Sequence, residues 1–169
     1  LAAAAPAPLG EETLVRDIAL DEQADPSDSP IILTLEGKTW DEPVVTKPKQ
    51  GATEIWRLIN PTGDTHPIHL HLVQFEVLDR QPFDVEAYLR GEGLHFTGPP
   101  VPREENEAGR KDTVRANPGE VTRIKAKFDL PTYGQIVLPP RVTAPQYVMH
   151  CHILEHEDNQ MMRPYEVVE

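Results

Sequence analysis

The chain has 169 residues, a formal net charge of −12 and eighteen prolines. This length suits one domain, or one domain with an arm, and is enough to bury a real core. The acidic balance argues against nucleic acid and anionic membrane surfaces as partners, and the apolar runs are too short to cross a bilayer. The many prolines favour an all-β protein with many turns.

The first ten residues, 1–10, are rich in alanine and proline and begin with leucine rather than methionine. They lack the basic region and the longer apolar run of a secretory signal. We interpret residues 1–12 as an extended linker, and we expect it to come from a longer polypeptide whose earlier part is missing. The alternative is a processed, complete small protein. Residues 13–169 are expected to form one domain.

Short strands are predicted for residues 13–20, 31–35 and 54–59, from their apolar and alternating residues. An acidic loop rich in proline and serine, residues 21–30, separates the first two. The turn-forming residues 60–64 end the third strand.

Residues 69–78 alternate as a strand, on which His69 and His71 point to the same side. Pro67 cannot donate a ladder hydrogen bond, so His66 is expected in the turn that enters this strand. In that position the His66 side chain is free to point elsewhere.

Residues 84–91 have an N-cap residue and a terminal glycine, which predict a short helix. A proline-rich surface loop is expected at 98–109, and strands at 121–128 and 147–152. A short turn or helix after the last strand carries His156. Many short strands without a strand–helix–strand rhythm favour an all-β sandwich with one or two short helices.

Six of the seven histidines lie in two short clusters, and the only cysteine lies in the second. Neighbouring side chains on a strand point to opposite faces, so Cys151 faces away from His150 and His152. One metal cannot bind groups on opposite faces, so this strand is predicted to stand between two metal centres.

The remaining donors divide in the same way. Thiolate, two imidazoles and a thioether form the ligand set of a blue-copper electron-transfer centre. The residues of that set are His66, Cys151, His156 and Met161. A histidine-only cluster, suited to oxygen, then contains His69, His71, His150 and His152.

Plainer interpretations exist for each part of these clusters. A lone buried cysteine is usually a small hydrophobic residue, and paired histidines often bind zinc, which would gain nothing from a methionine. Met149 and Met162 are expected in the core, and His95 is expected outside both clusters. Acidic residues beside the second cluster either form a solvated face or relay protons; they are Glu155, Glu157 and Asp158.

The chain resembles the C-terminal cupredoxin domain of multicopper oxidases, in the branch of bacterial spore-coat laccases and bilirubin oxidases. The similarity covers roughly residues 31–168. It rests on several motifs: Asn60-Pro61-Thr62, Thr65-His66-Pro67-Ile68-His69-Leu70-His71, Lys111-Asp112-Thr113, and His150-Cys151-His152 through His156-Glu157 to Met161.

This resemblance implies a cupredoxin-like Greek-key β-sandwich with copper as the cofactor. It implies a type 1 copper at His66, Cys151, His156 and Met161, a type 2 copper at His69, and a type 3 pair at His71, His150 and His152. Glu157 resembles a carboxylate that assists proton delivery in this branch.

In the family, four more histidines of the trinuclear cluster come from an N-terminal domain, and this sequence lacks those motifs. The implied partners are therefore N-terminal cupredoxin domains of the same enzyme, together with a small aromatic reductant and O2. The family also favours an extracellular, periplasmic or spore-coat location over the cytoplasm.

The leading functional hypothesis is a laccase-type oxidation of phenols or aromatic amines, with O2 reduced to water. It requires the missing N-terminal domain. One alternative is a single-domain blue-copper electron carrier, which would leave four histidines without a purpose. Another is a structural coat or scaffold domain in which copper is incidental.

Overall fold

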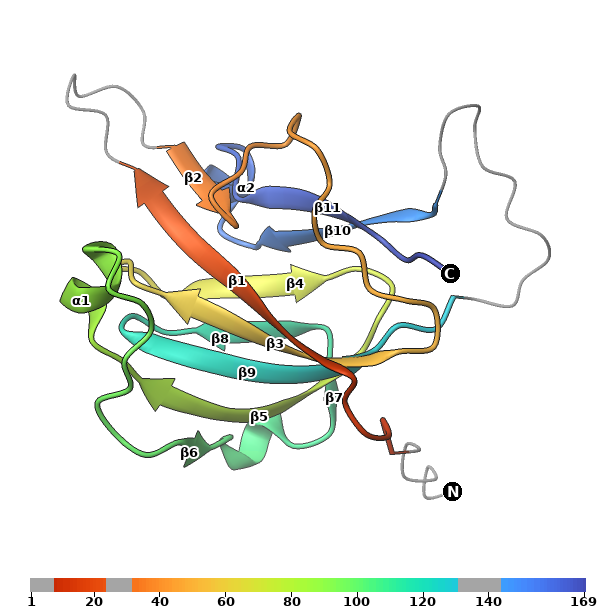
Figure 1. The fold of residues 1–169 in the computed structure, drawn as a ribbon, viewed down its shortest axis with the longest axis horizontal. Helices are drawn as coiled ribbons and strands as arrows, with labels where there is room; N and C mark the ends of the chain where they lie inside the picture. The colour runs from red at the N-terminus through yellow and green to blue at the C-terminus, as the bar shows by residue number, and fades with distance from the viewer. Residues whose placement is uncertain (1–7, 24–31, 131–143) are drawn as a thin grey trace.

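Strands dominate the computed structural model, which describes residues 8–23, 32–130 and 144–169 (Figure 1). Within these residues they form two sheets. The larger sheet contains β1 (Leu14–Gln23), β2 (Ile32–Leu35), β3 (Thr53–Asn60), β5 (Phe75–Pro82), β6 (Val101–Pro102), β7 (Arg110–Lys111) and β9 (Glu120–Lys127). The smaller sheet contains β4 (His66–Leu70), β8 (Thr113–Ala116), β10 (Gln146–Cys151) and β11 (Met162–Glu166).

The strand order mixes distant parts of the sequence. The larger sheet runs β2-β1-β3-β9-β5-β6, with β7 beside β5, and the smaller runs β11-β10-β4-β8. Among the described strands, β1 and β3 pair in parallel and all other pairs are antiparallel. One isolated bridge outside the strands, between Lys49 and Val168, is also parallel. Apolar side chains of both sheets form one buried cluster, so the core lies between the sheets.

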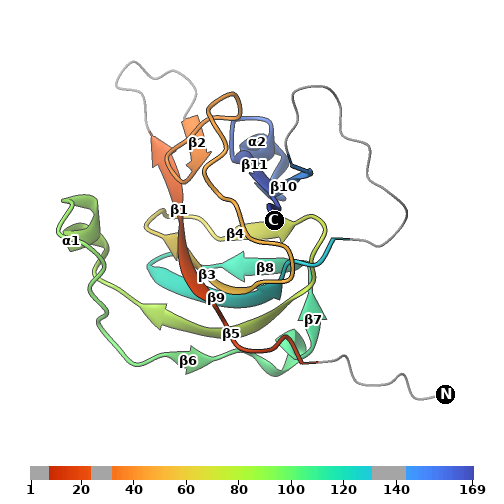
Figure 2. The ribbon, with the colours of Figure 1, turned by 45° about the vertical axis from the view of Figure 1, so that its right-hand side comes forward.

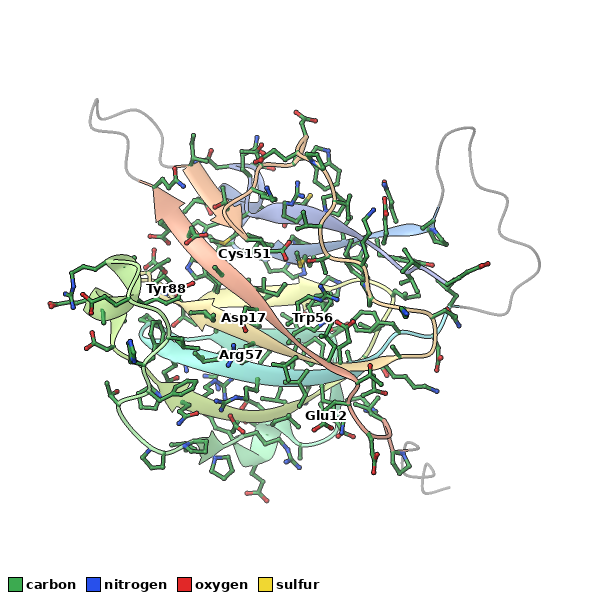
Figure 3. The ribbon with its side chains drawn as sticks, viewed as in Figure 1. Glu12, Asp17, Trp56, Arg57, Tyr88 and Cys151 are labelled. Atoms are coloured by element: carbon green, nitrogen blue, oxygen red, sulfur yellow. The ribbon has the colours of Figure 1, made fainter. Side chains whose placement is uncertain are left out.

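Aromatic side chains fill the centre of this core. Trp56 on β3 is fully buried and stacks on Phe128, with ring centroids 5.2 Å apart. Tyr165 on β11 meets the edge of Trp56 at 5.7 Å. On the outer face of the larger sheet, Arg57 donates to Asp17 at 2.6 Å (Figure 3). Trp56 and Arg57 are neighbours on β3, so alternation directs Trp56 into the core and Arg57 to the outer face.

The residues expected as one strand, 69–78, are divided between the two sheets, so that prediction is wrong. β4 ends at Leu70 and β5 begins at Phe75. Between them Leu72 has a left-handed φ of 69°. The bend carries the chain from the smaller sheet to the larger one, because β4 pairs with β8 and β10 whereas β5 pairs with β9.

The expected turn at His66 is also wrong. His66 is the first residue of β4 and pairs with Ala116 on β8. The Pro67 carbonyl accepts from the His152 amide, so the backbone of Pro67 faces β10 at a point beyond the last β4–β10 register pair. An N–H at Pro67 would face the same point. The missing N–H of Pro67 therefore interrupts no pair of that ladder.

The predicted helix is present as α1 (Val85–Leu89), and the Asp84 carboxylate caps it by accepting from the Ala87 amide at 2.9 Å. The expected loop at 98–109 contains β6 and the 3-10 helix η1 (Glu105–Glu107). α2 (Leu154–Glu157) follows β10, and in Figure 2 it lies beside β10 and β11, far from α1. Among the described residues no helix is long and apolar enough to cross a membrane.

The amino-terminal predictions are only partly tested. β1 extends to Gln23, so residues 21–23 of the expected acidic loop belong to a strand, and residues 24–30 lie outside the described residues. The predicted linker overlaps residues 1–7, which also lie outside them. Leu9 is buried, and its carbonyl accepts from the Thr53 hydroxyl at 2.5 Å. The end of that segment therefore packs on the domain.

Candidate metal centres

β10 passes between two groups of side chains that could bind metal ions. Cys151 pairs with Ile68 on β4, and His150 pairs with His69. Cys151 is fully buried and belongs to the apolar core cluster, and Figure 3 places it in the interior. The neighbouring His150 points to the other face, toward His69. The alternation of one strand thus supplies a thiol to one group and an imidazole to the other.

The inner group consists of His66, Cys151 and His156, whose donor atoms all lie within 4.8 Å of one another. The two Nδ1 atoms are 3.2 Å apart, and they lie 3.8 and 4.0 Å from Cys151 Sγ. Three such donors in a plane about 2.0–2.3 Å from one ion would be roughly 3.5–4 Å apart. The two Nδ1–Sγ distances lie in this range and the Nδ1–Nδ1 distance is slightly shorter, so the donor set could close around one trigonal copper ion.

Met161 lies next to this group and is fully buried. Its amide donates to the His156 carbonyl at 2.9 Å, and its carbonyl accepts from the Cys151 amide at 3.0 Å. Backbone hydrogen bonds thus tie the methionine to two members of the group. These contacts hold the Met161 backbone beside the inner group.

Burial favours the uncharged forms of two members of the inner group, Cys151 and His66, in the metal-free chain. It raises the pKa of the Cys151 thiol to about 11. It also lowers the pKa of His66 to about 4, with a further contribution from the neighbouring His156. A metal that binds the thiolate must therefore displace a proton. The Ile153 amide, 3.4 Å from Cys151 Sγ, is placed to stabilise the resulting negative sulfur.

The outer group is a cluster of four imidazoles. The ring centroids of neighbouring members are 4.7–5.4 Å apart. Burial and the neighbouring imidazoles lower the pKa of His71, which favours the neutral ring that binds metals. Its members are His69, His71, His150 and His152. An open pocket beside it is lined in part by Asp112 and Tyr147.

Further contacts select the free nitrogen of two outer rings. His69 Nδ1 lies 2.8 Å from the Asp112 carbonyl and 3.1 Å from Thr113 Oγ1. His150 Nδ1 lies 3.2 Å from a Glu157 carboxylate oxygen. Carbonyl and carboxylate oxygens only accept, so these Nδ1 atoms donate and the Nε2 atoms remain available for a metal. Glu157 thus contacts the outer group although it follows His156 in sequence.

Three residues discussed from the sequence lie elsewhere. His95 is exposed, and its Nε2 contacts the Glu92 carbonyl at 2.9 Å, away from both groups. Met149 is buried as expected. Met162 is only partly buried, so its placement in the core was wrong. It pairs with His150, whose side chain belongs to the outer group.

Sequence reasoning missed several residues that support the ligands. Asp112 and Thr113 contact His69, and Thr62 and Glu22 contact His66. Three of these four belong to the motifs quoted for the family. The motifs themselves could therefore have pointed to Asp112, Thr113 and Thr62. No feature of the sequence pointed to Glu22, because it lies in a stretch expected to be a loop.

The two-sheet sandwich with its two groups of ligands defines a cupredoxin-type domain. The family model described as multicopper oxidase matches residues 13–169, and the chain belongs to this family. Its fold resembles the McoA multicopper oxidase of Aquifex aeolicus, with a TM-score of 0.70 and 28% identity over 100% of this chain and 32% of that one. The expected family and fold are confirmed.

Curated relatives of the chain belong to the same family. The chain is 48% identical to a laccase of Bacillus subtilis, over 92% of this chain and 28% of the relative. It is 34% identical to multicopper oxidase LPR1 of Arabidopsis thaliana, over 96% of this chain and 30% of the relative. Laccases and multicopper oxidases are oxidoreductases, and the chain spans less than a third of the length of these relatives.

Proposed function

We propose that this chain is the C-terminal copper-binding domain of a laccase-type multicopper oxidase. The observation that carries the proposal is β10, which presents Cys151 to the inner group and His150 to the outer group. A simple zinc or structural site would explain one group but not the shared strand.

In this proposal the inner group holds a type 1 copper and the outer group supplies half of a trinuclear cluster. His66, Cys151 and His156 bind the first ion, with Met161 as axial ligand. The outer ligands are assigned as His69 for type 2 copper and His71, His150 and His152 for the type 3 pair. Copper bound at these places would supply one-electron chemistry and dioxygen reduction.

The side chains of the chain have distinct roles in this scheme. His156 is only partly buried, so its ring edge is where a phenolic or aromatic amine reductant meets the domain. The backbone from Cys151 to His150 and His152 is the shortest covalent link between the two groups. The Glu157 carboxylate lies 3.2 Å from His150 Nδ1, where it can relay protons to the oxygen-reducing cluster.

The outer group is incomplete without further domains. We propose that N-terminal cupredoxin domains of the same enzyme supply the remaining histidines, and that residues 1–12 are the linker from them. The domain alone then binds a single copper and does not reduce O2. With its partner domains it oxidises a small aromatic reductant and reduces O2 to water.

Metal analysis with absorption and paramagnetic resonance spectra tests this function. The full-length protein is expected to contain a blue mononuclear copper together with a three-copper cluster that shows the near-ultraviolet type 3 band. A single copper per molecule and no type 3 band would instead favour a blue-copper electron carrier. An isolated domain that consumes O2 would contradict the proposed need for partner domains.

A further inference from the structure

A hydrogen-bond network lies behind His66, on the side away from Cys151. The His66 ring is fully buried. Its Nδ1 faces Cys151 and His156, and its Nε2 lies 2.7 Å from Thr62 Oγ1. A neutral imidazole carries one hydrogen, and the nitrogen without it is the one that can bind a metal. The network therefore decides which nitrogen is free.

The buried amide of Asn60 sets the direction of this network. Its Nδ2 donates to the carbonyls of Asp64 and Ala116, at 2.8 and 2.9 Å. Carbonyl oxygens cannot donate, so this side of the amide must be the NH2 group. Oδ1 consequently points the other way and accepts from the Thr62 amide at 2.9 Å and the Thr62 hydroxyl at 2.8 Å.

The hydroxyl of Thr62 has one hydrogen and two lone pairs. The hydrogen goes to Asn60 Oδ1, and one lone pair accepts from the Asp64 amide at 3.3 Å. The second lone pair is left for His66 Nε2, which must then carry the hydrogen. Because the Asn60 and Asp64 partners are fixed by the backbone, this assignment follows from the chain itself.

Glu22 leads to the same assignment. Its Oε1 lies 3.4 Å from His66 Nε2 and has no hydrogen-bond partner among the described residues. A bare ring nitrogen would face this oxygen with its lone pair, so the longer Glu22 contact also favours a hydrogen on Nε2.

We propose that Thr62 is a positioning residue that, oriented by Asn60, holds His66 as the Nε2–H tautomer. The lone pair of Nδ1 then points toward Cys151 before any metal is present. Such preorganisation by an outer hydrogen bond fixes the ring orientation and strengthens the ligand. The tautomer does not depend on the proposed function, and only its effect on copper does.

Nitrogen NMR of the metal-free chain, labelled with ¹⁵N-histidine, tests the tautomer directly. The wild type and Thr62→Ser are expected to show a protonated Nε2 and a bare Nδ1 for His66. Thr62→Val removes the acceptor at nearly constant volume and is expected to populate the other tautomer. A wild type with protonated Nδ1, or a valine variant indistinguishable from wild type, would overturn the proposal.

Copper titration and redox titration of the full-length protein test the consequence. Thr62→Val is expected to weaken binding of the mononuclear copper about 10–100-fold and to raise its reduction potential, whereas Thr62→Ser retains wild-type values. Valine and serine variants with the same affinity and potential would refute the positioning role. If the wild type shows the expected tautomer but binds no copper, the proposed function fails and the tautomer assignment stands.

Discussion

Replacement of Glu107 by glutamine should destabilise the domain by about 3 kcal/mol, because it breaks a buried ion pair. The Arg80 and Glu107 side chains are only 8% and 10% exposed, and they form two hydrogen bonds of 2.6 and 2.7 Å. Arg80 also donates to the Arg115 carbonyl at 2.9 Å. Since Arg80 lies on β5 and Arg115 on β8, the pair connects the two sheets.

The loss has a characteristic pH dependence. Hydrogen bonds from Arg80 hold the pKa of Glu107 below its ordinary value, so the folded state binds a proton less readily than the unfolded chain. The stabilisation is complete above the ordinary glutamate pKa, about 4.3. It is lost as the pH falls through the lower folded value. The difference between wild type and Glu107→Gln should therefore narrow below about pH 4.

Urea unfolding from pH 3 to pH 7 measures the loss of stability and its pH dependence. In a thermal melt, 3 kcal/mol corresponds to a fall in Tm of roughly 6–12 °C for a domain of this size. Glu86→Gln is the matched control, since that carboxylate is 91% exposed in its pair with Arg90 and its loss should leave the stability nearly unchanged. A Glu107→Gln variant within 1 kcal/mol of wild type at pH 7, or a difference constant with pH, would refute this reasoning.

Three further predictions concern the ligands and the core. Cys151→Ser should abolish the intense blue absorption of the copper-loaded protein while circular dichroism shows the fold retained; surviving blue colour would contradict the assignment. Met161→Leu removes a weak donor to oxidised copper and should raise the reduction potential, so an unchanged or lower value in redox titration counts against an axial role. Trp56→Ala should destabilise the domain by about 3–5 kcal/mol in urea unfolding, because Trp56 is fully buried against Phe128 and Tyr165.

Local patterns predicted most of the individual elements. Alternation predicted β3, β9 and β10 to within one residue at each end. The N-cap Asp84 and Gly91, which follows the end of the helix, predicted α1. These signals are local, since a strand repeats every two residues and a helix end needs only its nearest neighbours. The opposite directions of Cys151 and His150 follow from the same period.

Long-range pairing decided what local patterns could not. The alternation of residues 69–78 continues without a break in the sequence, yet the chain bends at Leu72 because its two halves pair with different sheets. Pairing with β8 likewise draws His66 into a strand despite Pro67.

The sequence by itself determined which side chains share a face and which family the chain belongs to. Only the tertiary structure brought His66 beside Cys151 across 85 positions, placed Glu157 against His150 and aligned Asn60, Thr62 and Glu22 behind the His66 ring. Side-chain direction depends on the period of a single strand, whereas distances between ligands depend on the register between strands, which the packing of the whole core selects.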